Sequence, residues 1–144
     1  MPPEPNLKTE NESKYPLHIA AQQNRIDIVK WLIENGLAQP NTKDKMHNTA
    51  LHLASEKDSH QVAKFLIKNG ADLNAKDKAE NVPLHFALSF EVAKCLVENG
   101  AKIDAKNNEE KTALHTACIM KGNMNIVKFL IENGAKIESR DKFG

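Results

Sequence analysis

The chain has 144 residues, a net charge of +1 and only 5% aromatic residues. A balanced charge gives no global field for nucleic acid or an anionic membrane, so we expect neither as a partner. No run approaches the roughly 18 apolar residues that a membrane span needs. We therefore expect a soluble intracellular protein, placed in the cytoplasm, with the nucleus left open.

Residues 1–12 contain three prolines and three glutamates and lack an apolar run. Proline blocks helix formation, so we expect a disordered N-terminal arm and not a signal or transit peptide. The two cysteines, Cys95 and Cys118, form no CxxC pair. Nothing in their spacing requires a disulfide framework or an oxidising compartment.

A four-residue pattern ending in histidine recurs along the chain at intervals of 34, 33 and 30 residues. Such a period indicates an array of repeats. The length of the chain therefore indicates the number of repeats and not the number of domains. The copies are Tyr15-Pro16-Leu17-His18, Thr49-Ala50-Leu51-His52, Val82-Pro83-Leu84-His85 and Thr112-Ala113-Leu114-His115, and the Asn-Gly pairs that follow end at Gly36, Gly70, Gly100 and Gly134.

Each repeat predicts two helices. Thr49 and Thr112 are suited to cap a first helix of about two turns, and Pro16 and Pro83 fit its first turn. An apolar stripe predicts the second helix, which ends at the glycine; in the first repeat it is Ile26, Val29, Leu32 and Ile33. The polar connection that follows holds one aliphatic residue that we expect to be buried, Leu73, Ile103 or Ile137, and predicts a short hairpin-like finger.

These motifs resemble those of the ankyrin repeat family, whose unit of about 33 residues carries a Thr-Pro-Leu-His-x-Ala signature. The resemblance covers residues 13–144 and implies an α-solenoid of antiparallel helix pairs with β-hairpin-like fingers. The repeats it implies span about 13–43, 44–76, 77–106 and 107–140, with the start of a fifth at 141–144.

The repeats depart from the family pattern in three ways. The usual glycine of the finger tip is replaced by Ser13, His47, Glu80 and Glu110 and kept only as Gly144, which predicts backbone strain at the tips. From His85 to Gly100 the third repeat spans 15 residues, against 18 in the first two, which predicts a shortened first helix or a tightened turn with Phe90 filling the space. The fourth repeat has an extra residue near 119–122, which predicts a longer turn.

The last complete repeat keeps the apolar pattern of internal repeats, although solenoids need polar end caps. We expect the chain to be part of a longer array. The alternative is that a partner, or a second copy associating end to end, covers this apolar end of an otherwise monomeric protein.

No metal or cofactor is expected. The tetrapeptide histidines belong to different repeats about 10 Å apart, whereas zinc ligands lie about 2.0–2.3 Å from one ion. The family resemblance implies that each histidine bonds the motif threonine and the neighbouring loop. Tyr15 and Val82 replace that threonine and should weaken the bond.

Catalysis is not expected either. Cys118 and His115 share a helix face and form the least favoured alternative, a cysteine enzyme. His115 is already expected to have a structural role, and we expect both cysteines to pack as small apolar residues. No glycine-rich phosphate loop is present.

Charged residues recur at fixed positions. In the second helices Lys30, Lys64, Lys94 and Lys128 predict a solvated face with weak pairs to Glu34, Glu98 and Glu132. The fingers repeat cations, separated by Asp44, Asp77 and Asp141, that either meet an acidic partner segment or keep the fingers soluble. These cations are Lys43, Lys45, Lys76, Lys78, Lys106, Arg140 and Lys142.

In the ankyrin family, partners usually dock on the concave side, formed by finger tips and the ends of first helices. The corresponding residues here are Gln22, Gln23, Lys45, Met46, Asn48, Glu56, Lys57, Lys78, Ala79, Asn81, Ser89, Asn108, Glu109, Lys111, Ile119, Met120, Lys142 and Phe143. Ile119 and Met120 are apolar where solvent is expected, so we predict that they anchor a partner. The competing interpretation is that the extra residue of that turn tucks them inward.

Asn74, with Leu66 eight residues earlier, resembles the substrate pattern of the asparaginyl hydroxylase of animal cells, which predicts a hydroxylation site. The sequence as a whole predicts a non-catalytic protein-interaction module of four ankyrin repeats. The alternative is a regulatory or targeting segment of a larger multidomain protein.

Overall fold

The computed structural model describes residues 15–120 and 123–144, and its helices form four consecutive pairs. The first helices of the pairs are α1 (Pro16–Gln22), α3 (Ala50–Glu56), the 3-10 helix η1 (Pro83–Phe86) and α6 (Ala113–Ile119). The second helices are α2 (Ile26–Glu34), α4 (His60–Lys68), α5 (Phe90–Glu98) and α7 (Met124–Glu132).

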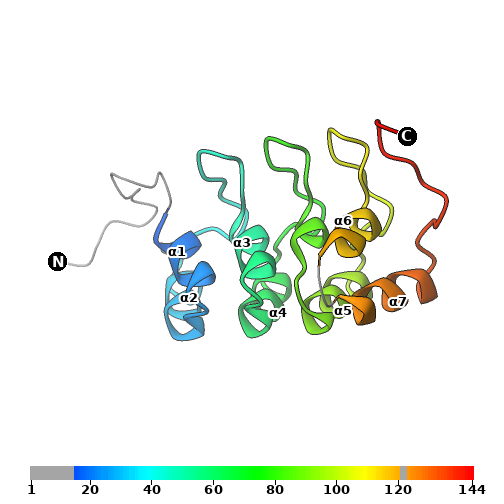
Figure 1. The fold of residues 1–144 in the computed structure, drawn as a ribbon. Coiled ribbons are helices and arrows are strands. Elements are labelled where there is room, and N and C mark those ends of the chain that lie inside the picture. The colour runs from blue at the N-terminus through cyan, green and yellow to red at the C-terminus, as the bar shows by residue number, and fades with distance from the viewer. Residues whose placement is uncertain (1–14, 121–122) are drawn as a thin grey trace.

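The pairs stand side by side in one row, and a loop leaves each pair in the same direction (Figure 1). First helices contact first helices, as α3 does with α1 and η1, and second helices contact second helices. The buried residues between them are mainly Leu, Val and Ala, including Leu51 and Val62, which have no exposed surface. The protein is therefore a helical repeat solenoid whose core lies between neighbouring repeats.

The helix ends follow the sequence signals. The Oγ1 of Thr49 accepts a bond of 3.4 Å from the backbone N–H of His52 at the start of α3. After α4, Gly70 takes a left-handed φ of 90°, and the N–H of Ala71 returns to the carbonyl of Leu66 at 2.9 Å. Glycine adopts this conformation without a Cβ clash, so it ends the helix and turns the chain into the finger.

Each finger is a tight turn, and the described residues contain no β-strand. In the second finger the N–H of Asp77 bonds the carbonyl of Asn81 at 3.0 Å, and Glu80 occupies the tip with a φ of 62°. His47 and Glu110 adopt the same left-handed conformation. The predicted tip strain is confirmed at these positions, whereas the predicted β-hairpin character of the fingers is not confirmed.

The fingers are joined to one another by backbone and side-chain bonds. The N–H of Lys78 donates to the carbonyl of Met46 at 3.1 Å, and that of Asn108 to Ala79 at 3.0 Å. Lower on the fingers, the Oδ1 of Asn41 accepts from the N–H of Asp72 at 2.7 Å. Because successive fingers are tied at two levels, they form one continuous row above the helices.

The deletion in the third repeat falls in its first helix. The element η1 has only four residues, against seven in α1, α3 and α6, which confirms the predicted shortening. The prediction that Phe90 fills the vacated turn is wrong. Ser89 caps α5 by accepting from the N–H of Val92 at 3.2 Å, which places Phe90 at the start of α5, 37% exposed. There its ring packs edge to face against the ring of Phe129, with the ring centres 5.3 Å apart.

The fourth repeat keeps a first helix of normal length. Its helix α6 ends at Ile119, and Met120 is already extended, with φ −80° and ψ 133°. Residues 121–122 of the predicted longer turn lie outside the described residues, as do the predicted arm at 1–12 and Ser13.

Candidate protein-interaction surface

The tetrapeptide histidines connect each first helix to the finger that follows it. The ring of His52 accepts at Nδ1 from the N–H of Thr49 at 3.1 Å and also contacts the Thr49 hydroxyl at 2.9 Å. Its Nε2 lies 2.9 Å from the carbonyl oxygen of Asn81. A carbonyl only accepts, so Nε2 carries the proton and the ring is the neutral tautomer.

The same connection recurs in other repeats. His18 reaches the carbonyl of Asn48 at 2.9 Å, and His85 reaches that of Lys111 at 2.8 Å. Burial lowers the pKa of both His52 and His85, which keeps the rings neutral. Val82, which replaces the threonine, still donates its N–H to His85 Nδ1 at 3.1 Å, so only the hydroxyl contact is lost.

The structure gives no support to catalysis by Cys118 and His115. His115 Nδ1 accepts from the N–H of Thr112 at 3.0 Å, as its counterparts do. No hydrogen bond joins Cys118 to His115 in the described part of the chain. The prediction that Cys118 is a packing residue is wrong, because α6 exposes it, whereas Cys95 is buried as expected. Among residues 15–120 and 123–144, no three His, Cys, Asp or Glu side chains gather as metal ligands.

Some residues expected on the concave side belong to the scaffold. The backbone carbonyls of Asn48, Asn81 and Lys111 accept the histidine bonds. The Oδ1 of Asn81 also accepts from Asn107 Nδ2 at 2.9 Å, and Ser89 caps α5. The half-buried members of the expected set are Gln22, Asn48, Ala79, Asn81, Ser89, Glu109, Lys111 and Met120.

Other members of the set are open to solvent. They are Gln23, Lys45, Met46, Glu56, Lys57, Lys78, Asn108, Ile119, Lys142 and Phe143. Three of them are large apolar side chains: Met46 is 55% exposed, Ile119 70% and Phe143 74%. Met120 differs from Ile119, because it is half-buried and its sulfur accepts from Asn123 Nδ2 at 3.4 Å. Ile119 is thus the more accessible member of the expected anchor.

Ile119 also borders an apolar hollow of about 390 Å³ at the C-terminal end of the stack, between α6 and α7. Ile131 and Ile137 share this hollow and are 38% and 68% exposed. The prediction of one buried aliphatic residue in each finger is therefore wrong for Ile137. Inside the stack the equivalent position to Ile137 is Leu73, which packs against the core. No further described helix covers this hollow.

The opposite side of the solenoid presents the second helices. Lys30, Lys64, Lys94 and Lys128 are exposed, as predicted, but none forms an ion pair among the described residues. The predicted pairs with the following glutamates are therefore wrong. Two of these lysines lie near aromatic rings instead: the Nζ of Lys30 is 5.8 Å from the centre of Phe65, and that of Lys94 is 5.8 Å from Phe90.

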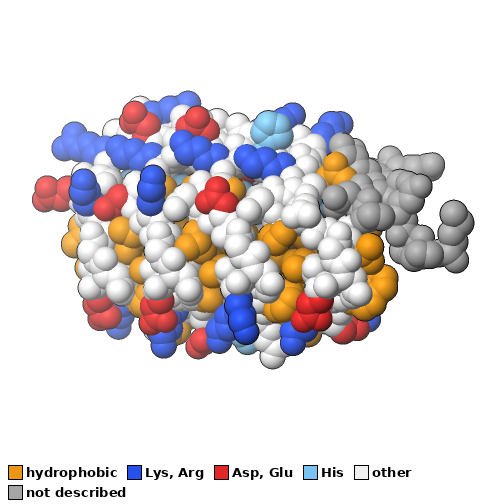
Figure 2. All heavy atoms as spheres, turned by 180° about the vertical axis from the view of Figure 1, so that it is seen from behind, with side chains coloured by type: hydrophobic (Ala, Val, Ile, Leu, Met, Phe, Trp, Pro, Cys, Tyr) orange, Lys and Arg blue, Asp and Glu red, His pale blue; other side chains and the backbone are white. Residues whose placement is uncertain are grey.

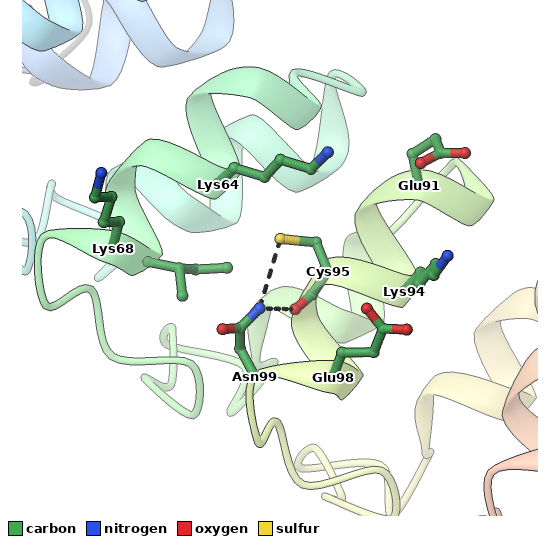
Figure 3. A pocket seen from close by; sticks show the side chains of 8 residues that line it. Lys64, Lys68, Glu91, Lys94, Cys95, Glu98 and Asn99 are labelled. Carbon is green, nitrogen blue, oxygen red and sulfur yellow. Dashed lines mark hydrogen bonds between the residues drawn. The ribbon is translucent and has the colours of Figure 1, made fainter.

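A groove of about 460 Å³ separates α4 from α5 on this side. Figure 3 shows the sulfur of Cys95 directed toward α4, with Asn99 donating to the Cys95 carbonyl at 2.7 Å. Burial raises the pKa of the Cys95 thiol, which keeps it protonated and a poor nucleophile. The groove therefore lacks the reactive group that would make it a candidate active site.

Asn74, the predicted hydroxylation site, has a structural role. Its Oδ1 accepts from the N–H of Lys102 at 2.9 Å, and the equivalent Asp104 accepts from Lys136 at 3.0 Å. Asn74 is half-buried in this bridge between fingers. These bridges were not predicted from the sequence, although the recurrence of Asn or Asp at positions 41, 74 and 104 was a signal for them.

The stacked helix pairs, the histidine connections and the row of fingers define a helical repeat protein. A family model described as ankyrin repeats (3 copies) matches residues 1–77 and 75–141. The chain therefore belongs to the ankyrin repeat family. Members of this family are generally non-enzymatic protein-interaction modules. None of the curated proteins compared matched the chain. No described helix is long and apolar enough to cross a membrane.

Proposed function

We propose that this protein binds another protein through the surface formed by the finger tips and the ends of the first helices, without catalysing a reaction. The observation that carries the proposal is the exposure of large apolar side chains on a rigid scaffold, above all Ile119 at 70%. A buried apolar anchor with a polar surround is the usual source of binding energy in protein complexes. Lys45, Lys78 and Asn108 are exposed polar residues of successive finger tips and belong to the same expected surface.

The test is affinity capture from the native cell with the wild type and an Ile119→Ala/Met120→Ala variant, followed by titration of the captured protein. Loss of both apolar side chains should weaken binding by about tenfold or more. Met124→Ala is the matched control, because Met124 is 61% exposed but starts α7 outside the expected set. Equal affinity of the double variant and the wild type, with both proteins folded, contradicts the anchor.

A second candidate is end-to-end association of two copies through the C-terminal hollow. The exposed Ile131 and Ile137 favour it, because apolar surface of this kind is covered in internal repeats. Sedimentation of the wild type and Ile137→Asp over a range of concentrations tests it. A wild type that stays monomeric throughout contradicts the association.

Three further proposals concern context. The chain acts in the cytoplasm, which imaging of the tagged protein in its native cell tests. It serves as a regulatory or targeting segment if the full-length transcript encodes additional domains. Asn74 is hydroxylated if protein isolated from the native cell is heavier by one oxygen atom and an Asn74→Gln variant is not. Absence of the added oxygen in both proteins contradicts the modification.

A further inference from the structure

Each finger carries one exposed cation at the same position before its tip. These four residues, called here the outer finger row, are Lys43, Lys76, Lys106 and Arg140. Figure 2 shows Lys and Arg side chains following one another along the finger-bearing edge of the molecule, with Asp and Glu side chains among them. Because the fingers are bonded to one another, the backbone positions that carry the row recur once per repeat.

The aspartates next to this row serve the turns. The Oδ1 of Asp44 accepts from the N–H groups of Met46 and Asn48 at 2.9 and 2.8 Å, and Asp44 is only 6% exposed. Asp77 makes the equivalent bonds in the second finger. These carboxylates are directed at backbone donors, so they shape the fingers instead of pairing with the lysines of the row.

The cations themselves are weakly engaged. The Nζ of Lys76 lies 3.8 Å from the Oε2 of Glu80, and both side chains are 54% exposed. An ion pair this exposed contributes little to stability. The Nζ of Lys43 donates to the carbonyl of Lys76 at 3.0 Å, which holds it between the first two fingers. In the described part of the chain, Lys106 and Arg140 form no ion pair. The row can therefore accept carboxylates from outside.

The positive charge is stronger over the first two fingers than over the last two. Beside Lys43 and Lys76, two positions earlier, stand the neutral side chains of Asn41 and Asn74. Beside Lys106 and Arg140, Asp104 and Glu138 hold the same positions. Lys43 and Lys76 should consequently contribute most to the attraction of an anion.

The spacing of the row selects a partner conformation. Neighbouring repeats lie about 10 Å apart, the distance between packed helices. A polyproline II segment rises about 3.1 Å per residue with three residues per turn. Every third side chain of such a segment therefore lies on one side, about 9 Å from the next, close to the spacing of the fingers.

We propose that the outer finger row binds an extended acidic segment of a partner protein, in the polyproline II conformation, with a carboxylate at every third position. The proposal rests on the proposed role as a protein-interaction module but uses a surface separate from Ile119 and Met120. Each carboxylate of the segment pairs with one cation of the row, and Lys43 meets its carboxylate between the first two fingers, where its Nζ also donates to the carbonyl of Lys76.

The probe is a fluorescent peptide of four Glu-Pro-Pro units, and its control has the same composition with the four glutamates adjacent. Binding is measured by anisotropy at low salt. The periodic peptide should bind about fivefold more tightly, because only its carboxylates reach successive fingers. Equal affinity for the two peptides overturns the proposed register.

Lys43→Gln/Lys76→Gln should weaken binding of the periodic peptide by about tenfold. The matched control is Lys30→Gln/Lys64→Gln, which removes the same charge from α2 and α4 with one change per repeat, and it should weaken binding less than about twofold. Equal losses in the two variants, or equally effective competition by a single-stranded oligonucleotide of the same charge, overturn the proposal in favour of unspecific anion binding.

Melting temperatures of both variants confirm that they are folded. The two proposals fail separately. If the periodic peptide does not bind while the Ile119→Ala/Met120→Ala variant still loses its captured partner, the outer finger row is rejected and the proposed function stands. If the capture result fails while the peptide binds as expected, the row stands and the apolar anchor is rejected.

Discussion

The Nε2 atom of His52 lies 2.9 Å from the carbonyl oxygen of Asn81, which stands at the end of the following finger. His52 is 1% exposed, and its other ring nitrogen accepts from the N–H of Thr49. One neutral side chain thus fixes the start of its own helix and the position of the next finger. Protonation of Nδ1 would remove the acceptor of the Thr49 N–H and leave a buried polar group without its bond.

This arrangement predicts that stability falls at mildly acidic pH. The pKa of His52 in the folded protein is lowered from its ordinary value of 6.5 by burial, so the unfolded chain binds more protons as the pH falls. The free energy of unfolding should therefore decrease from about pH 7.5 to about pH 5.5. Urea denaturation of the wild type and His52→Gln at both pH values measures the effect.

The His52→Gln variant should be less stable at neutral pH but should lose less stability on acidification. His85 still contributes to the pH dependence of this variant, because burial lowers the pKa of His85 in the same way. His47→Asn is the control, since His47 is an exposed tip residue and asparagine tolerates its left-handed φ of 63°. An identical pH dependence in His52→Gln and the wild type would contradict the assignment.

Restoring the motif threonine at position 82 should raise the free energy of unfolding measurably. Val82 is 2% exposed and keeps only the backbone bond to His85. Val82→Thr adds the hydroxyl contact seen between Thr49 and His52 at 2.9 Å and should raise the free energy of unfolding by about 0.5–1 kcal/mol. Thr49→Val is the reverse control and should lower it by a similar amount. A loss of stability in Val82→Thr would show that the hydroxyl finds no partner there.

The finger tips should accept glycine with a gain in stability. Glu110 has a φ of 59°, a conformation that costs a residue with a Cβ about 1–2 kcal/mol. Glu110→Gly removes this strain and should stabilise the protein by about 0.5–1 kcal/mol after the entropy cost of glycine. Glu110→Ala removes the same charge but keeps the Cβ, so it should show no such gain. Equal effects of the two substitutions would attribute the change to charge.

The edge-to-face contact of Phe90 with Phe129 should couple the third and fourth repeats. Their ring centres are 5.3 Å apart, and aromatic pairs of this geometry contribute about 0.5–1.5 kcal/mol beyond simple burial. A double-mutant cycle with Phe90→Leu and Phe129→Leu, measured by thermal and urea denaturation, should give a coupling energy in that range. Strictly additive effects would show that the two rings pack independently.

The structural consequences of the irregular repeats could be predicted only in part. The short interval from His85 to Gly100 predicted the reduced helix η1, because a helix pair with fewer residues must lose helical turns. It did not place Phe90, since the cap formed by Ser89 decides which residue opens α5. The exposure of Cys118 also escaped prediction, because its environment depends on whether another helix covers the end of the stack.

The amino-acid sequence by itself determined the period and the helix pairs, because caps, apolar spacing and glycine act within one repeat. The scaffold role of the histidines came from the resemblance to the ankyrin family. Only the tertiary structure decided which polar residues are used up by the scaffold and which reach solvent. Asp44 and Lys43 are adjacent and both charged, yet the first closes the finger on backbone N–H groups and the second reaches the neighbouring finger. That division depends on contacts between residues far apart in the chain, which local pattern does not encode.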